Sequence, residues 1–168
     1  MAGATAARAG HVAIVDMHGE ALDAARDARP AISAVETYCL DVRDREAYAE
    51  VADKVEAALG PVSLLFNNAG VASGVHVKQM TYEQWDWTLG VNLNGVVNGI
   101  QTFVPRMLAR GEGGYAVNTA SGAGLVASSA GFLYSPSKFA VVGRSAALPL
   151  DLAPIWRGVA VVCAGSGC

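Results

Sequence analysis

The segment Tyr134-Ser135-Pro136-Ser137-Lys138 places a phenol and an ammonium group four residues apart. If a helix begins near Leu133, both side chains lie on one face of it, one turn apart. A phenol titrates near pH ~10 in water, and a nearby cation favours the phenolate form. A tyrosine in such a setting can act as a general acid or base on an alcohol or a ketone. The plain alternative for so short a motif is a surface tyrosine beside a solvated lysine.

Further polar residues follow apolar runs upstream of this segment. Ser121 comes just after a strand-like run, and its hydroxyl could hydrogen-bond the same substrate oxygen and stabilise charge there. Asn67-Asn68-Ala69-Gly70 follows another apolar run. Asn92 lies in a long amphipathic segment, where an inward-facing amide is costly unless it is hydrogen-bonded.

Asn-Asn-Ala-Gly at residues 67–70, followed in order by Asn92, Ser121, Tyr134 and Lys138, strongly resembles the classical short-chain dehydrogenase/reductase family. The resemblance covers residues 6–165 and implies an oxidoreductase that interconverts an alcohol and a ketone or aldehyde. Hydride transfer in the family uses a nicotinamide cofactor.

The resemblance also implies a catalytic role for each matched residue. Tyr134 would exchange a proton with the substrate oxygen, and Ser121 would position and polarise that oxygen. Lys138 would lower the tyrosine pKa and hold the nicotinamide ribose. Asn92 would hold a water molecule that links the lysine to solvent.

Several residues are expected to contact the cofactor. Asp16 ends a short apolar run, where a carboxylate can accept hydrogen bonds from the adenosine ribose and repel a 2′-phosphate. NAD is therefore expected rather than NADP, with a helix cap for residues 17–29 as the alternative for Asp16. Asp41-Val42 resembles the adenine-contacting pair of the family, and a helix cap is an equal alternative for Asp41. The small residues of Asn68-Ala69-Gly70 let the backbone approach a ribose closely, unless they only form a tight turn.

The chain alternates short apolar runs with helical patterns. We expect strands at 11–16, 37–42, 62–66, 115–118 and 159–163, and helices at 19–29, 43–59, 81–110 and from Tyr134 onward; residues 1–10 resemble the end of a helix. Thr81 to Gln84 has the form of a capping box. This alternation predicts an α/β fold with a doubly wound parallel sheet, Rossmann-like, in three α/β/α layers. Ligands bind at the carboxyl ends of such strands, where Asp16, Asp41, Asn68, Gly70 and Ser121 fall.

Two parts of the family pattern are missing from this sequence. The family opens with a strand and a Thr-Gly-x-x-x-Gly-x-Gly loop that cradles pyrophosphate, and no such motif is present. The sequence also stops where the family adds a substrate-covering segment. Residues 1–168 are therefore expected to form a single incomplete domain, truncated at both ends and lacking the first strand. A second hypothesis follows, in which the chain is a catalytically inactive relic that serves as an interaction or regulatory module.

Composition limits the class of protein. The chain has 168 residues, of which 52% are hydrophobic and 16% charged, so it can form a folded domain with a core. A net charge of −3 without a basic block argues against nucleic acid as a partner. No run of apolar residues is long enough to span a membrane, and no signal-peptide pattern is present. A cytoplasmic protein is expected.

The remaining expectations concern cysteines and assembly. Cys39, Cys163 and Cys168 lack metal-ligand spacing, so we expect reduced thiols, with Cys39 in the core and no metal site. The family pairs two helices across a two-fold axis, which suggests a homo-oligomer through helices 81–110 and 134–152. Pro149 lies inside the second of these helices, where an interior proline costs on the order of 3 kcal/mol.

Overall fold

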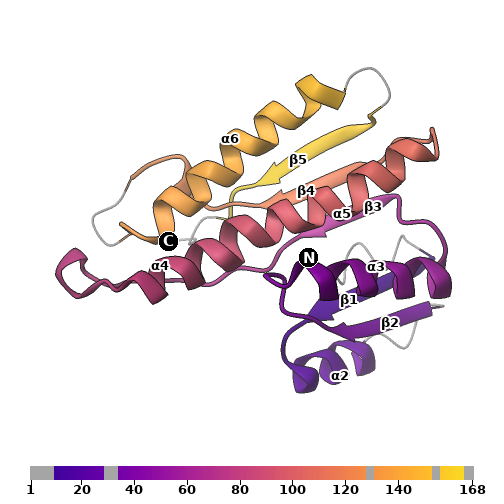
Figure 1. Cartoon of the computed structure of the whole chain (residues 1–168), viewed down its shortest axis with the longest axis horizontal. Coiled ribbons are helices and arrows are strands. Elements are labelled where there is room, and N and C mark those ends of the chain that lie inside the picture. Colours follow the sequence, from indigo (N-terminus) through magenta and orange to yellow (C-terminus); the bar gives the residue numbers. More distant parts are fainter. Residues whose placement is uncertain (1–9, 29–33, 128–130, 153–155, 165–168) are drawn as a thin grey trace. The chain divides into compact units, whose positions relative to one another are not determined.

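The computed structural model describes residues 10–28, 34–127, 131–152 and 156–164 (Figure 1). The expected helix end at residues 1–10 lies almost wholly outside these ranges. The chain divides into two compact units, Met1–Val62 and Ser63–Cys168, which are described separately. Whether they act as one domain stays a prediction.

The described residues of the first unit form two strands and two helices: β1 (His11–Asp16), α2 (Gly19–Asp27), β2 (Ala34–Cys39) and α3 (Arg45–Leu59). The strands run parallel, with His11 opposite Ala34 and Asp16 opposite Cys39. Each element lies close to its predicted position, except that β2 starts and ends three residues earlier than the run 37–42.

The two helices of this unit cover opposite faces of the strand pair. Neighbouring residues of a strand point to opposite faces of the sheet. On one face, Thr37 accepts a hydrogen bond from Arg26 of α2. On the other face, the Tyr38 hydroxyl donates to the backbone oxygen of Lys54 in α3. Leu40, Val51 and Val55 form the buried cluster on the α3 side. The unit therefore has the three layers expected of a doubly wound fold.

Cys39 is exposed, so the expectation of a core cysteine was wrong. It is the last residue of β2. Its thiol lies beside the loop after β1 and approaches the backbone oxygen of Met17 at 3.5 Å. A strand pattern predicts which face a side chain takes, but not how completely that face is covered.

In the second unit, the part of the chain that the structure describes forms three strands and three α-helices, with shorter helical segments between them: β3 (Leu64–Asn67), η1 (Val77–Gln79), α4 (Tyr82–Leu89), η2 (Gly90–Asn94), α5 (Gly95–Ala109), β4 (Tyr115–Thr119), η3 (Gly122–Gly124), α6 (Tyr134–Leu152) and β5 (Gly158–Val162). The strands are parallel in the order β3-β4-β5. The described strands thus form two parallel sheets, β1-β2 and β3-β4-β5.

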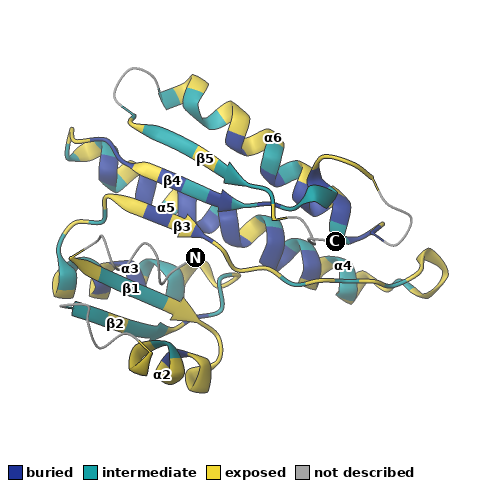
Figure 2. Ribbon diagram, turned by 180° about the vertical axis from the view of Figure 1, so that it is seen from behind, coloured by how far each residue is buried: buried dark blue, intermediate teal, exposed yellow. Residues whose placement is uncertain are grey.

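Helices α5 and α6 pack together on one face of the three-stranded sheet (Figure 1). Val96, Ile100 and Val104 of α5 and Val141 of α6 form the buried cluster there, with Ala120 after β4. Neighbouring residues of β3 alternate accordingly: Leu65 and Asn67 are buried, whereas Leu64 and Phe66 are exposed. Figure 2 shows that much of α5 is also buried. The helical layer and the carboxyl ends of the strands position the candidate site.

The predicted long helix 81–110 is interrupted. It opens with the predicted capping box, in which the Thr81 hydroxyl accepts from the Gln84 backbone N–H and the Gln84 side chain accepts from the Thr81 N–H. Between α4 and α5 the segment Gly90–Asn94 winds as a π-helix. Such wide turns are rare and frequently occur at functional sites. Pro149 lies inside α6, as the sequence predicts.

Candidate active site

The candidate site begins at the first turn of α6. Tyr134 starts the helix, and Pro136 falls in the first turn, where its missing N–H and fixed backbone angle are tolerated. The Ser137 hydroxyl donates to the backbone oxygen of Tyr134 at 2.6 Å and ties this turn together. Lys138 follows one turn after Tyr134, and its Nζ lies 5.7 Å from the centre of the tyrosine ring.

Lys138 is unusual because its charge is buried. The residue is 3% exposed, and its Nζ donates to the backbone oxygen of Thr119 at 3.0 Å. No carboxylate forms a salt bridge with it among the described residues. Burial lowers the pKa of its ammonium group. One of its three N–H donors is thus accounted for within the described chain, and two remain for a ligand.

Asn92 sits in the π-helical segment and is fully buried, as its inward-facing amide requires. Its Oδ1 accepts from the Val71 N–H at 2.8 Å, and its Nδ2 donates to the Val71 carbonyl at 3.0 Å. The Nδ2 also donates to the Ser137 hydroxyl at 3.1 Å. Asn92 therefore joins the loop after β3 to the first turn of α6 and holds both in place.

Gly70 lies against this pair of side chains. A Cβ added there would meet Lys138 Nζ at 3.3 Å and Asn92 Oδ1 at 3.4 Å. Any larger residue would crowd the ammonium group. Asn68 is exposed beside it and accepts from the Thr119 hydroxyl at 3.0 Å, and Ala69 is also exposed. The loop 68–70 thus presents a small, open backbone surface next to Lys138.

Ser121 follows β4, two residues after the Thr119 carbonyl that holds Lys138. Its Oγ accepts from the Ala123 N–H at 3.2 Å, a bond that leaves its own O–H free to donate. The η3 turn that follows packs closely on α6, because a Cβ on Gly124 would lie 2.8 Å from the Lys138 carbonyl oxygen. The segments carrying Ser121 and Lys138 are therefore in direct contact.

A buried polar chain fixes α6 on the sheet. Asn67 Nδ2 donates to Asn118 Oδ1 at 2.8 Å, and Asn118 Nδ2 donates to the Ser145 hydroxyl at 2.9 Å. Ser145 in turn donates to the Val141 carbonyl at 2.7 Å. All four residues are buried. Buried amides bonded in this way restrict how a helix can rotate or slide on its sheet.

The remaining predicted residues belong to the first unit. Asp16 ends β1, and its Oδ1 accepts from the His18 backbone N–H at 2.9 Å and contacts the His18 ring at 3.1 Å. The N-cap of α2 is His18, without a side-chain cap bond, so Asp16 does not cap this helix. Its Oδ2 has no partner among the described residues and can accept a hydrogen bond.

Asp41 binds its neighbour Arg43 rather than a helix end. Arg43 donates to it from the backbone and from the guanidinium group, and these bonds lower the pKa of the Asp41 carboxyl group. The N-cap of α3 is Asp44, whose side chain accepts from Glu46 and Ala47, so the cap alternative for Asp41 was wrong. Val42 beside it is half-buried.

Sequence reasoning did not single out Val71, Thr119, Gly124 or Ser137 as parts of this site. Val71 and Thr119 act through backbone atoms, which every residue type has, so the sequence does not identify them. Ser137 and Gly124 could have been noticed, because a serine three residues after Tyr134 and a glycine three residues after Ser121 are both visible in the sequence.

Other classes of site find no support in the described ranges. No group of three histidine, cysteine or acidic side chains there could hold a metal ion. Among the helices of the described chain, none combines the length and hydropathy needed to cross a membrane.

A model of the short chain dehydrogenase family matches residues 1–168. The chain belongs to the short-chain dehydrogenase family. Members of this family are oxidoreductases, so the resemblance drawn from the Asn-Asn-Ala-Gly, Ser121 and Tyr-x-x-x-Lys motifs is confirmed.

Known members of the family are similar over most of this chain. A C alpha-dehydrogenase of Sphingobium sp. is 49% identical over 104 residues, which are 61% of this chain and 34% of that protein. A D-threitol dehydrogenase of Mycolicibacterium smegmatis is 35% identical over 159 residues, 94% of this chain and 59% of that protein. A short-chain dehydrogenase of Burkholderia phymatum, solved in complex with NAD, is 35% identical with a TM-score of 0.83, and the match covers 91% of this chain and 55% of that one.

These matches confirm the Rossmann-like fold and place the chain among oxidoreductases. The chain spans about a third to three fifths of the length of these three family members.

Proposed function

We propose that the protein is an NAD-dependent oxidoreductase that interconverts an alcohol and a ketone or aldehyde. The observation that carries the proposal is the buried Lys138 ammonium beside the Tyr134 ring. A buried, unpaired charge destabilises a fold, and it is retained at functional sites far more often than elsewhere. The NAD-bound family member at 35% identity supports the cofactor.

The residues present fit a nicotinamide dinucleotide. Lys138 keeps two N–H donors for ribose hydroxyls, and Gly70 leaves the space beside its Nζ that a Cβ would fill. Asn68, Ala69 and Gly70 would form the backbone surface that faces the ribose. The nicotinamide ring supplies or accepts the hydride when the cofactor is bound.

Each catalytic residue then has a defined task. Tyr134 would give its phenol proton to a carbonyl oxygen in the reducing direction and take a proton from the hydroxyl in the oxidising direction. Lys138 would favour the phenolate through its charge. Ser121 would donate its free O–H to the reacting oxygen and stabilise the charge that develops there.

Asn92 would keep this arrangement in place. Both N–H bonds of its amide are used by Val71 and Ser137, so its side chain acts here as a brace between the loop at 68–71 and the first turn of α6. We propose that the water link between Lys138 and solvent forms beside this brace.

Asp16 supports NAD over NADP. Its free Oδ2 can accept from a ribose hydroxyl, and its charge repels a 2′-phosphate. We also propose Asp41 and Val42 as contacts for the adenine, with Asp41 held in place by Arg43.

The test of the proposed function is turnover of secondary alcohols with NAD. Residues 1–168 alone should show no detectable rate, because the sequence offers no glycine-rich turn for the pyrophosphate. The same residues extended by the first strand, the glycine loop and the C-terminal segment of a family member should show activity. Tyr134→Phe should then lower kcat by about a hundredfold or more.

Tyr115→Phe is the matched control, since Tyr115 is an exposed tyrosine of the same unit that does not line the hollow described below. If the extended chain is active and both variants retain that activity, Tyr134 is not the acid–base group and the proposal fails. Robust turnover by residues 1–168 alone would show that the glycine loop is dispensable.

The second hypothesis, a catalytically inactive interaction module, predicts a different result. The extended chain would then remain inactive, and NADH would not quench the tryptophan fluorescence of either form at millimolar concentration. The exposed apolar face of the three-stranded sheet, with Leu64, Phe66 and Tyr115, is the feature that favours this alternative.

A further inference from the structure

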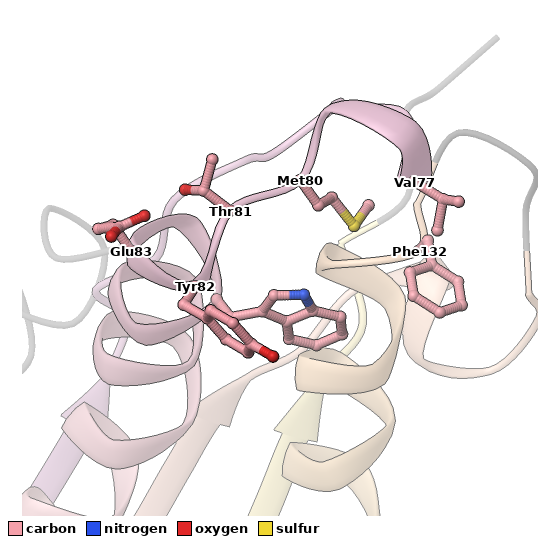
Figure 3. Close-up of a pocket in the computed structure, with 7 residues that line it drawn as sticks. Val77, Met80, Thr81, Tyr82, Glu83 and Phe132 are labelled. Carbon is pink, nitrogen blue, oxygen red and sulfur yellow. The ribbon is translucent and has the colours of Figure 1, made fainter.

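A hollow of about 560 Å³ lies in the second unit, between the segment at 77–85 and the residues just before α6 (Figure 3). Its lining is mainly apolar and aromatic: Val77, Met80, Tyr82, Trp85 and Phe132, with Thr81 and Glu83 at its edge. Val77, Tyr82 and Phe132 each expose more than half of their surface. Large apolar side chains gathered at an open hollow commonly mark a binding site.

The hollow borders the candidate active site through two segments. Phe132 stands two residues before Tyr134, at the entry to α6. The loop from Gly70, anchored by Val71 on Asn92, continues directly into the η1 turn and Met80. One segment thus leads into the first turn of α6, the other begins beside Asn92, and both contribute residues to the hollow.

An aromatic pair fixes the wall of the hollow. The rings of Trp85 and Phe132 lie edge to face, with their centres 5.8 Å apart and their planes at 84°. This contact joins α4 to the segment that leads into Tyr134. Aromatic rings prefer such offset or edge-on neighbours, so a further flat ring can be added to the pair in the same manner.

The polar groups at the edge are already in use. The Thr81 hydroxyl accepts from the Gln84 N–H, and it hydrogen-bonds the Glu83 carboxyl group and lowers the pKa of that group. Glu83 therefore stays negatively charged at the edge of the hollow. The mainly apolar lining offers few partners to the hydroxyls of a polyol, and the Glu83 carboxylate would repel an anionic substrate.

We propose that this hollow holds an uncharged aromatic ring of the substrate, with Trp85 and Phe132 as specificity-determining residues. The inference rests on the proposed function, because it makes the hollow part of the substrate site next to Tyr134 and Ser121. The substrate is then a neutral secondary alcohol or ketone that carries an aryl group.

Binding can be measured without turnover. Saturation-transfer NMR on residues 1–168, without cofactor, should show saturable binding of 1-phenylethanol and none of ribitol, an open-chain polyol. Phe132→Ala should weaken the binding of 1-phenylethanol by about tenfold, as the loss of a hydrophobic pocket contact does. Phe139→Ala is the matched control, since Phe139 is an exposed phenylalanine of α6 that does not line the hollow.

A second variant removes any dependence on how Phe132→Ala folds. Val77 is exposed in a short turn, so Val77→Asp should be tolerated, and its carboxylate should abolish binding of the ring. Any of three results overturns the inference. Ribitol and 1-phenylethanol bind equally well, the two phenylalanine variants have equal effects, or 1-phenylethanol does not bind. A second copy of the chain that covers the hollow would give this last result.

The outcomes also separate the inference from the proposed function. Ring binding that follows this pattern, in a chain that shows no activity even after extension, upholds the ring site and removes the oxidoreductase proposal. Turnover by the extended chain of alcohols without a ring, but not of 1-phenylethanol, upholds the oxidoreductase and overturns the ring site.

Discussion

Gly124 gives the sharpest test of how the structure positions the catalytic turn. It lies in η3, three residues after Ser121, and is buried against the backbone of Lys138. A Cβ there would lie 2.8 Å from the Lys138 carbonyl oxygen and 2.9 Å from its carbonyl carbon. Side-chain carbons do not approach backbone atoms so closely, and a helix backbone cannot rotate aside. Gly124→Ala must therefore move η3 away from the first turns of α6.

The size of the effect follows from the cost of overpacking. Adding a methyl group to a filled site costs about 1–3 kcal/mol. Gly143 is the matched control, because it is an exposed glycine of α6 whose added Cβ would meet nothing within 4 Å. Gly143→Ala should stabilise the chain by about 0.5–1 kcal/mol, since glycine is a poor helix former. The two substitutions are the same in chemistry and opposite in expected sign.

Urea unfolding followed by far-UV circular dichroism measures both effects. With a denaturant slope of about 2 kcal/mol/M, Gly124→Ala should lower the unfolding midpoint by about 0.5–1.5 M, and Gly143→Ala should raise it by about 0.25–0.5 M. An unchanged or raised midpoint for Gly124→Ala would show that η3 and α6 are not in contact as described. The link from Ser121 to Lys138 would then have to be abandoned.

Three further substitutions test other parts of the structure. Burial lowers the pKa of Lys138, so the native chain loses this proton at a lower pH than the unfolded chain does. The free energy of unfolding therefore rises with pH until the pH reaches 10.5, the ordinary pKa of a lysine. Lys138→Met should therefore be more stable than the original chain near neutral pH, with an advantage that shrinks towards pH 10.5; a pH-independent difference in urea titrations would contradict this. Thr81→Ala should cost about 1 kcal/mol in the same assay through loss of the capping box, whereas Thr81→Ser should cost little. In the extended, cofactor-binding chain, Asp16→Ser should reduce the ratio of NADP to NAD dissociation constants about tenfold or more, and an unaltered ratio by fluorescence titration would exclude Asp16 from the ribose site.

The order of strands and helices, and the family itself, could be predicted from the sequence alone. Short apolar runs alternating with amphipathic segments report burial on both faces of a parallel sheet, and this pattern is local. The spacing of Tyr134 and Lys138 on one helical face is also local, since the helix repeat fixes it. The capping box at Thr81 was predicted for the same reason.

The remaining features depend on contacts between residues far apart in the chain. The brace from Val71 through Asn92 to Ser137 uses backbone atoms, and the support of Lys138 is a backbone oxygen of Thr119, which any residue type could provide. The π-helical turn around Asn92 adds an extra residue to one turn of the long helix, and the sequence pattern of that helix does not predict this turn.

Alternatives left open by local patterns were settled by tertiary packing. Asp41 and Asp44 have the same side chain three residues apart, and the structure uses Asp44 as the cap of α3 while Asp41 binds Arg43. Cys39 has the apolar neighbours of a core residue, yet it is exposed at the end of β2. The sequence by itself determined which residues alternate, cap and pair along one helix. Only the tertiary structure decided which of them meet, because burial and hydrogen-bond partners are properties of the whole packed unit.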